Sequence, residues 1–134
     1  MAKLETYDKK IIRATTDQAE ALTAIAFAAK CYWGYPERWI KLWASILTIT
    51  EPYLRENECF AVMQAGSPVG FYALSFREHR ASLEHLWIQP VYIGQGFGAE
   101  LFQHALARCR ELGVHRLEIE SDPNAQEFYE KMGA

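Results

Sequence analysis

A glycine-rich turn in the second half of the chain contains the residues whose types and spacing could do chemistry. The turn reads Ile93-Gly94-Gln95-Gly96-Phe97-Gly98; it follows the strand-like run Leu86-Trp87-Ile88 and leads into a helical pattern. Glycines let backbone N–H groups turn inward without interference from a Cβ atom. A helix start adds unpaired N–H groups and a partial positive charge. Together these features predict an anion site suited to a phosphate or a pyrophosphate.

Two common phosphate-binding patterns fit this turn less well. A Walker A loop needs Gly-Lys-Ser/Thr, which the chain does not contain. Gly94, Gly96 and Ala99 satisfy the GxGxxA form of a Rossmann fingerprint. Glu118 follows at the spacing where that fold carries an acidic residue. In that fold, however, the glycines follow the strand directly, whereas five residues separate Ile88 from Gly94 here.

Apolar runs and helical stripes along the chain predict the elements that must position this turn. The expected order is β-α-α-β-β-β-α-β-α, with the three middle strands forming an antiparallel meander. We expect a strand at 11–12, a helix capped by Thr16 or Asp17 and running to 29, a helix over 36–49, strands at 59–63, 69–76 and 82–89, a helix over 96–112, a strand at 117–119 and a helix starting at Asn124. Gly113 is the expected left-handed residue after the long helix.

Composition narrows the class of protein. Half of the 134 residues are apolar and 23% are charged, which argues against a disordered chain and suits one domain over residues 1–134. The net charge of −3 lacks the basic excess of a nucleic-acid-binding protein. No apolar stretch reaches membrane-spanning length, and the N-terminus lacks a signal-peptide pattern. Cys31, Cys59 and Cys109 form no CxxC pair, so we expect reduced thiols in a cytoplasmic protein without a zinc site.

Two motifs give the chain a family resemblance. From about Ile11 to Ala134 it resembles the GNAT superfamily of N-acetyltransferases. The acetyl-CoA loop of that superfamily reads Arg/Gln-x-x-Gly-x-Gly/Ala after a strand and a Pro-x-Tyr-like lead. The matching residues are Gly96 and Gly98 in the loop and Pro90 and Tyr92 in the lead. A second motif, Asn-x-x-Ala-x-x-Phe-Tyr-x-x-x-Gly-Phe, is matched in part by Asn124, Phe128, Tyr129 and Gly133, with Ala125 directly after the asparagine.

The resemblance implies a GNAT-like α+β fold. Its central sheet is mostly antiparallel, with helices on both faces and one pair of neighbouring strands splayed apart. It implies acetyl-CoA as acyl donor, no metal, and a strand whose backbone pairs with the amide-rich arm of CoA. The cofactor-binding residues expected from it are Leu86, Trp87, Ile88, Ile93, Gly94, Gln95, Gly96, Phe97, Gly98, Ala99 and Asn124. Asn124 also fits a helix N-cap, and the two roles are compatible.

Two features depart from the family pattern. Ile93 stands where the family usually has Arg or Gln, so backbone N–H groups must carry more of the phosphate binding. The family usually continues with two more strands, whereas this sequence ends at Gly133-Ala134. We therefore expect those C-terminal strands to be missing and one sheet edge to be exposed. A partner chain could cover that edge, for instance in a homodimer.

The resemblance also implies residues for the chemistry. Glu84 is the expected base for the attacking amine, because strand alternation would place it on one face with Leu86 and Ile88. The alternative interpretation of Glu84 is a solvated or ion-paired side chain, and His85 is the reserve base. Tyr129 resembles the family's general acid, since its hydroxyl is protonated at neutral pH; the alternative is core packing.

An aromatic segment between the first two helices is expected on the acceptor side. Trp33 and Tyr35 are the residues we expect to bind a cationic amine, with lid or core packing as the alternative. The predicted function is direct transfer of an acetyl group from acetyl-CoA to a primary amine of a small molecule or peptide. The main rival is a non-catalytic acyl-CoA-binding or regulatory module of the same fold, and a nucleotide-binding protein ranks third.

Overall fold

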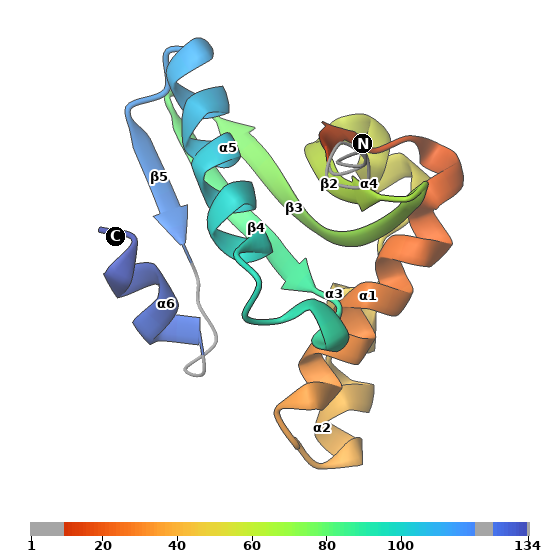
Figure 1. The fold of residues 1–134 in the computed structure, drawn as a ribbon. Helices are drawn as coiled ribbons and strands as arrows, with labels where there is room; N and C mark the ends of the chain where they lie inside the picture. Colours follow the sequence, from red (N-terminus) through yellow and green to blue (C-terminus); the bar gives the residue numbers. More distant parts are fainter. Residues whose placement is uncertain (1–9, 120–124, 134) are drawn as a thin grey trace, which may run out of the picture.

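Five strands form one sheet at the centre of the molecule. The computed structural model describes residues 10–119 and 125–133. The strands are β1 (Lys10–Arg13), β2 (Glu58–Gln64), β3 (Ser67–Arg77), β4 (Arg80–Ile88) and β5 (Arg116–Ile119), and they lie in this order across the sheet (Figure 1). The first three neighbouring pairs are antiparallel, and β4 pairs with β5 in parallel. The expected mixed α+β fold with an antiparallel meander is confirmed.

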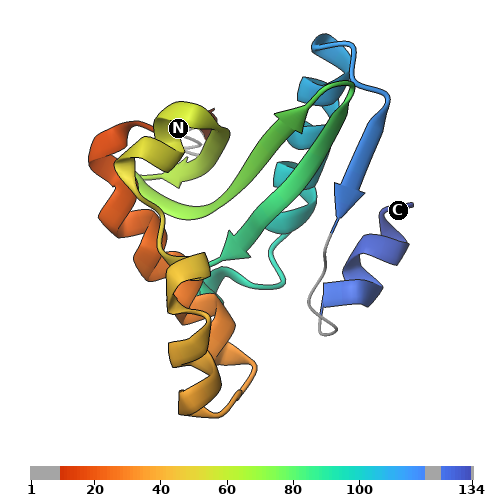
Figure 2. The same ribbon diagram turned by 180° about the vertical axis from the view of Figure 1, so that it is seen from behind.

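Helices cover both faces of this sheet. They are α1 (Ala19–Tyr32), α2 (Glu37–Leu42), α3 (Ala44–Leu47), α4 (Glu51–Glu56), α5 (Phe97–Glu111) and α6 (Gln126–Lys131), with 3₁₀ turns at Thr16–Gln18 and Pro90–Tyr92. One core lies between the sheet and α1, α3 and α4, and a second lies between the sheet and α5 and α6 (Figures 1 and 2). Within the described residues, no helix is long and apolar enough to cross a membrane.

Strand alternation divides the apolar residues of the central strands between these two cores. On β3, Phe71 and Ala73 face the core with α1, whereas Tyr72 and Leu74 face the core with α5. All four side chains are fully buried. The long apolar run of β3 therefore reflects a strand that is covered on both sides.

The helical region before β2 differs from the prediction. The expected helix over 36–49 is interrupted at Trp43, whose φ of −90° and ψ of 0° end α2 before α3 begins. A further helix, α4, was not predicted. Thr50 caps it by accepting a hydrogen bond from the Tyr53 N–H (3.2 Å), and Pro52 lies in its first turn.

The structure corrects one predicted helix start and agrees with one predicted helix end. Thr15, rather than Thr16 or Asp17, caps the turn before α1, and its N–H donates to Gln18 Oε1 (2.9 Å). Gly113 has the expected left-handed conformation after α5, with φ of +73°. Asn124, the predicted start of the last helix, lies outside the described residues.

The parallel pair of strands is shorter than β4. In the part of the chain that the structure describes, β5 pairs with β4 over Arg80–Leu83 and ends at Ile119, opposite Leu83. The last residues of β4 therefore have one backbone edge without a strand neighbour among the described residues. Whether the two strands splay apart beyond this point depends on residues outside that part and stays a prediction.

Candidate active site

A cavity of about 450 Å³ lies where β4 leaves the sheet and α5 begins. We call it the loop cavity. Its walls come from the end of α1, the last residues of β4, the glycine-rich turn and the start of α6. The lining residues are Ala29, Trp33, Leu86, Trp87, Ile88, Tyr92, Ile93, Gly94, Gly96, Phe97, Gly98, Ala99, Ala125, Phe128 and Tyr129.

The glycines of the turn meet two different demands. Gly94 and Gly96 have φ of +88° and +89°, in the left-handed region that residues with a Cβ atom disfavour. At Gly98 the available space matters, because a Cβ there would already be in van der Waals contact with the Phe128 ring (3.4 Å) and a side chain larger than alanine would press on that ring. Since α5 begins at Phe97, the N–H groups of Gly98 and Ala99 in its first turn have no carbonyl partner within the helix. The turn thus has the geometry of an anion site.

Most residues predicted to bind the cofactor line this one cavity. Leu86, Trp87 and Ile88 contribute from β4, and the turn contributes the rest. Gln95 is absent from the lining and its side chain donates to the Val91 carbonyl (3.4 Å). Asn124 again falls outside the described residues. The cofactor roles of these residues stay predictions, but nine of the eleven predicted residues line this one cavity.

The two residues expected to bind the acceptor amine lie in different surroundings. Trp33 lines the loop cavity. Tyr35 lies in an aromatic cluster, where its ring meets those of Trp39 and Trp43 at centroid distances of 6.0 and 5.1 Å. Lys30 Nζ lies 4.8 Å from the centroid of the Tyr35 ring and 4.2 Å from that of Trp43. Tyr35 therefore packs against the aromatic side chains of Trp39 and Trp43, and it is not among the residues that line the loop cavity.

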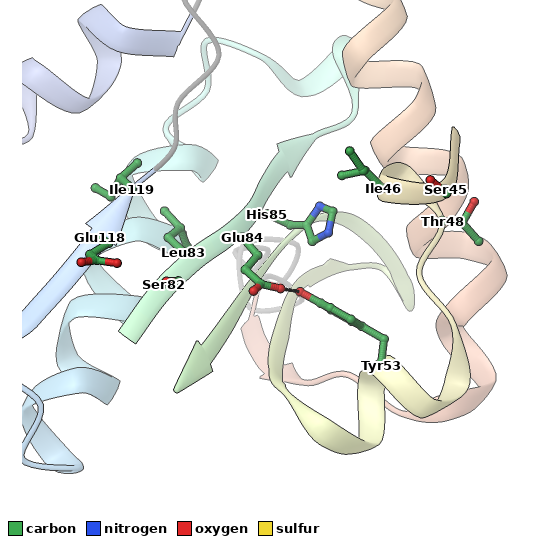
Figure 3. A pocket seen from close by; sticks show the side chains of 10 residues that line it. All are labelled: Ser45, Ile46, Thr48, Tyr53, Ser82, Leu83, Glu84, His85, Glu118 and Ile119. Carbon is green, nitrogen blue, oxygen red and sulfur yellow. Dashed lines mark hydrogen bonds between the residues drawn. The ribbon is translucent and has the colours of Figure 1, made fainter. Parts of the chain in front are cut away.

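A second cavity, of about 530 Å³, lies at an earlier segment of the same strand, and we call it the carboxylate cavity. Residues of β4, the end of β5, α4 and the α3 region surround it (Figure 3). Its lining residues are Ser45, Ile46, Thr48, Tyr53, Ser82, Leu83, Glu84, His85, Glu118 and Ile119. None of these lining residues is a lysine or an arginine.

Glu84 enters this cavity because β4 contains a β-bulge. Ala73 pairs with His85 and Leu74 pairs with Leu83, so Glu84 is an extra residue in β4 without a partner on β3. The prediction that Glu84 shares a face with Leu86 and Ile88 is therefore wrong. The bulge breaks the alternation, and Glu84 lies on the same face as His85 (Figure 3).

Two hydroxyl groups hold the Glu84 carboxylate. Tyr53 Oη donates to Glu84 Oε1 (2.5 Å), and Ser75 Oγ donates to Glu84 Oε2 (2.8 Å). Burial, and then the neighbouring Glu84, raise the pKa of Tyr53 well above its ordinary value. Tyr53 consequently keeps its proton and remains a donor to the carboxylate. The Glu84 side chain is exposed, so solvent and a bound molecule can reach it.

His85 is held in a single protonation pattern. The Trp87 Nε1–H donates to His85 Nδ1 (2.9 Å). Because the side chain is 6% exposed, burial lowers the pKa of His85 to about 4, and the ring is neutral at neutral pH. A neutral imidazole that accepts at Nδ1 carries its proton on Nε2. Neither nitrogen is then free to take a proton, which argues against the reserve role of His85 as a base.

Tyr129 combines the two interpretations that the sequence left open. Its ring packs against Phe102 and Phe128 at centroid distances of 5.6 and 5.1 Å, and it also lines the loop cavity. Burial raises the pKa of Tyr129 to about 12, so the hydroxyl keeps its proton throughout the neutral range. The side chain can thus pack in the core and still present a proton donor to a bound molecule.

These cavities lie in a mixed α+β domain, and a family comparison identifies its class. The model of the Acetyltransferase (GNAT) family matches residues 25–134. This chain belongs to that family. The match covers the glycine-rich turn, both cavities and the last helix.

Solved structures support the same fold. PaiA N-acetyltransferase from Thermoplasma acidophilum, in complex with coenzyme A, has a TM-score of 0.81 at 18% identity, over 92% of this chain and 87% of that one. A GCN5-related N-acetyltransferase from Ralstonia eutropha JMP134 also has a TM-score of 0.81, at 17% identity, over 94% and 92% of the two chains. A GNAT family acetyltransferase from Brucella melitensis, in complex with acetyl-CoA, has a TM-score of 0.70 at 18% identity, over 90% and 80%.

One curated relative matches over a shorter stretch. An uncharacterized N-acetyltransferase ycf52-like protein from Prochlorococcus marinus is 33% identical over 54 residues. This match spans 40% of the present chain and 30% of that protein.

Sequence reasoning missed most of the carboxylate cavity. Tyr53 was overlooked because α4 was overlooked, although Thr50-Glu51-Pro52 carries the cap residue, the acidic first turn and the early proline of a helix start. Ser75 lies in a strand that was predicted, but its contact with Glu84 depends on the bulge. No feature of the local sequence Leu83-Glu84-His85 predicts that β4 contains one residue without a partner on β3.

Proposed function

We propose that this protein transfers the acetyl group of acetyl-CoA directly to a primary amine of a small molecule or peptide. The observation that carries the proposal is the position of β4 between the two cavities. Residues 86–88 line the loop cavity and residues 82–85 line the carboxylate cavity. A thioester held along the first segment would therefore meet an amine held along the second, which is the proximity that a transfer between two substrates requires.

In this proposal the loop cavity binds acetyl-CoA. The N–H groups of the turn and of the first turn of α5 receive the pyrophosphate. The open backbone edge of 86–88 pairs with the amide groups of the pantetheine arm, as an added strand would. Ile93 lines this cavity and is 42% exposed. Because its side chain is apolar, it brings no charge to the phosphates.

Glu84 is the proposed base. An ammonium group has no lone pair, so the acceptor must lose a proton before its nitrogen attacks the thioester carbonyl carbon. Glu84 takes that proton, directly or through a water molecule. The hydroxyls of Tyr53 and Ser75 keep the carboxylate in one orientation while leaving further lone pairs on both oxygens for the incoming amine.

Tyr129 is the proposed acid. When the carbon–sulfur bond breaks, the electron pair leaves with the sulfur, and the Tyr129 hydroxyl donates its proton to the departing thiolate. Direct transfer is favoured over an acetyl-enzyme because no cysteine is among the described residues that line the two cavities. Cys59 and Cys109 are buried, and burial raises the pKa of both thiols, to about 12 for Cys59.

A non-catalytic acyl-CoA-binding module is the second candidate. Ile93 favours it, because the missing cation removes one expected contact with the pyrophosphate. The carboxylate cavity favours the enzyme, because a module that only binds acyl-CoA has no use for a carboxylate held beside the thioester.

The experiment that separates them combines two readouts. Release of free thiol from acetyl-CoA is followed over a panel of primary amines, and mass spectrometry identifies the acetylated product. Amine-dependent thiol release with a matching N-acetyl product supports the enzyme. Stabilisation by acetyl-CoA in thermal melts without any such product would assign the chain to the binding module instead.

A further inference from the structure

The bulge of β4 turns two neighbouring residues toward one cavity, and this arrangement bears on the acceptor. We propose that His85 Nε2–H is a hydrogen-bond donor in the carboxylate cavity, and that the acceptor is an amine carrying a hydroxyl or amide oxygen close to its amino group. The inference rests on the proposed function and specifies the class of amine. It assigns His85 as a residue that determines specificity rather than as a base.

The Trp87 contact decides which nitrogen carries the proton. An indole N–H can only donate, so His85 Nδ1 must accept at the observed distance of 2.9 Å. The ring packs edge-on against Tyr53 and is tilted against Phe71, at centroid distances of 5.7 and 5.9 Å. These contacts restrain the ring, so Nε2 remains the protonated nitrogen.

Nε2 also remains available to a ligand. Among the described residues, Gln64 Oε1 is the one buried side-chain nitrogen or oxygen without a hydrogen-bond partner. His85 Nε2 has no hydrogen-bond partner within these residues either, yet this atom is not fully buried. It therefore meets the cavity that His85 lines. A buried ring with one nitrogen satisfied and one open to a cavity is suited to bind a ligand atom.

His85 can donate a hydrogen bond in this cavity, and the Glu84 carboxylate can accept one. In a regular strand, adjacent residues face opposite sides, but the bulge at Glu84 places Glu84 and His85 on one side. Tyr53 contacts both, through its hydroxyl and its ring. A molecule that offers an amino group to Glu84 therefore also has an N–H donor within its reach, and an oxygen atom would satisfy it.

The remaining lining limits which oxygen this can be. Ser45, Thr48 and Ser82 add neutral hydroxyls to the cavity. A substrate carboxylate would meet the negative charge of Glu84, and the lining offers no lysine or arginine to offset it. A hydroxyl or an amide carbonyl accepts from Nε2 without that repulsion. The cavity thus favours amino alcohols and amino amides over plain alkylamines and amino acids.

The test compares three small primary amines of similar size: ethanolamine, glycinamide and propylamine. For each variant, kcat/KM with ethanolamine or glycinamide is divided by kcat/KM with propylamine. Intrinsic differences in amine reactivity cancel when these ratios are compared between variants. His85→Phe keeps an aromatic ring but removes the donor, and His85→Gln retains a side-chain N–H. His79→Phe, at an exposed histidine between β3 and β4, is the matched control.

We expect the preference for the two oxygen-bearing amines to fall about tenfold in His85→Phe, in line with the loss of one hydrogen bond. It should persist in His85→Gln and His79→Phe. An unchanged ratio in His85→Phe, or an equal loss in His79→Phe, would overturn the inference. If the wild type acetylates none of these three amines but acetylates another amine of the panel, the class of acceptor assigned here fails; if it acetylates no amine of the panel, the proposed function itself fails. If they are acetylated without preference, only the assignment of His85 fails.

A measurement without turnover covers the case in which His85→Phe does not fold. Nitrogen-15 NMR of the wild-type protein distinguishes the two neutral tautomers of histidine, and His85→Gln identifies the signal of His85. We expect the Nε2–H tautomer at neutral pH, and a shift of that signal when ethanolamine binds. The Nδ1–H tautomer would overturn the inference, since Nε2 would then accept rather than donate.

Discussion

Replacing Tyr129 with phenylalanine separates its proposed role as an acid from its packing role. The substitution removes one oxygen and leaves the ring that packs against Phe102 and Phe128. Within residues 10–119 and 125–133, no hydrogen bond joins Tyr129 Oη to another group, so the change leaves no described partner unsatisfied. Because the volume of the core is preserved, we expect a change in folding stability below about 1.5 kcal/mol.

The expected kinetic effect is much larger. Loss of a general acid slows the chemical step roughly 10²–10⁴-fold. This corresponds to about 3–5 kcal/mol of transition-state stabilisation. The affinity for acetyl-CoA should barely change, because the interaction develops with the charge on the departing sulfur. Single-turnover measurements of thiol release give the chemical step, and thermal melts with and without acetyl-CoA give stability and binding.

Alkaline pH provides a second check on the same variant. Burial raises the Tyr129 pKa from 10.0 to about 12, so folding disfavours the charged phenolate. The stabilising contribution of this shift is complete below pH 10 and is lost as the pH rises toward 12. Tyr129→Phe should therefore lose less stability than the wild type in this window. Normal single-turnover rates in Tyr129→Phe would refute the catalytic role and leave Tyr129 as a core residue.

Three further outcomes follow from the two cavities. Glu84→Gln should reduce kcat/KM at neutral pH, and the defect should lessen at high pH, where more of the amine is already uncharged; a defect independent of pH would contradict the role as base. Gly96→Val and Gly98→Val should each weaken acetyl-CoA binding in titration calorimetry, the first through backbone strain and the second through contact with Phe128. Unchanged affinity in both would remove the turn from the binding site. Ile93→Arg should tighten acetyl-CoA by on the order of 1 kcal/mol at low salt, and the gain should shrink as salt is added; no gain at low salt would mean that residue 93 points away from the phosphates.

The elements that the sequence predicts well are those with long or unambiguous patterns. The long helix after the turn shows an apolar stripe over four turns, and Gly113 marks its end. The middle strands carry continuous apolar runs separated by the Ala65-Gly66 turn. Such signals survive in isolation because many residues contribute to each of them.

Short helices were harder to predict for a physical reason. A six-residue helix such as α4 has too few residues to be stable by itself or to show periodicity. It forms because Leu54 is buried in the core beside α1 and because Tyr53 reaches across to β4. The interruption at Trp43 likewise accompanies aromatic contacts with Tyr35 and Trp39, which no local propensity describes.

The loop cavity and the carboxylate cavity differ in how far the sequence could predict them. The loop cavity depends on backbone conformations that only glycine adopts readily, so its residues are visible as a motif. The carboxylate cavity depends on contacts between β4, α4 and the end of β5, which are distant in the sequence. Glu84 was identified by resemblance, but the two hydroxyls that orient it could only be found in the folded chain.

The bulge at Glu84 determines on which face of β4 the carboxylate lies. Perfect alternation along β4 would place the carboxylate on the face of Leu86 and Ile88, beside α5 and within an apolar core. An unpaired carboxylate there would be strongly disfavoured in its charged form, which is the form that accepts a proton. One extra residue moves the carboxylate to the opposite face, where two hydroxyls and solvent meet it. Leu86 and Ile88 keep their positions beside the glycine-rich turn, so the strand serves both cavities at the expense of a single irregularity in its pairing.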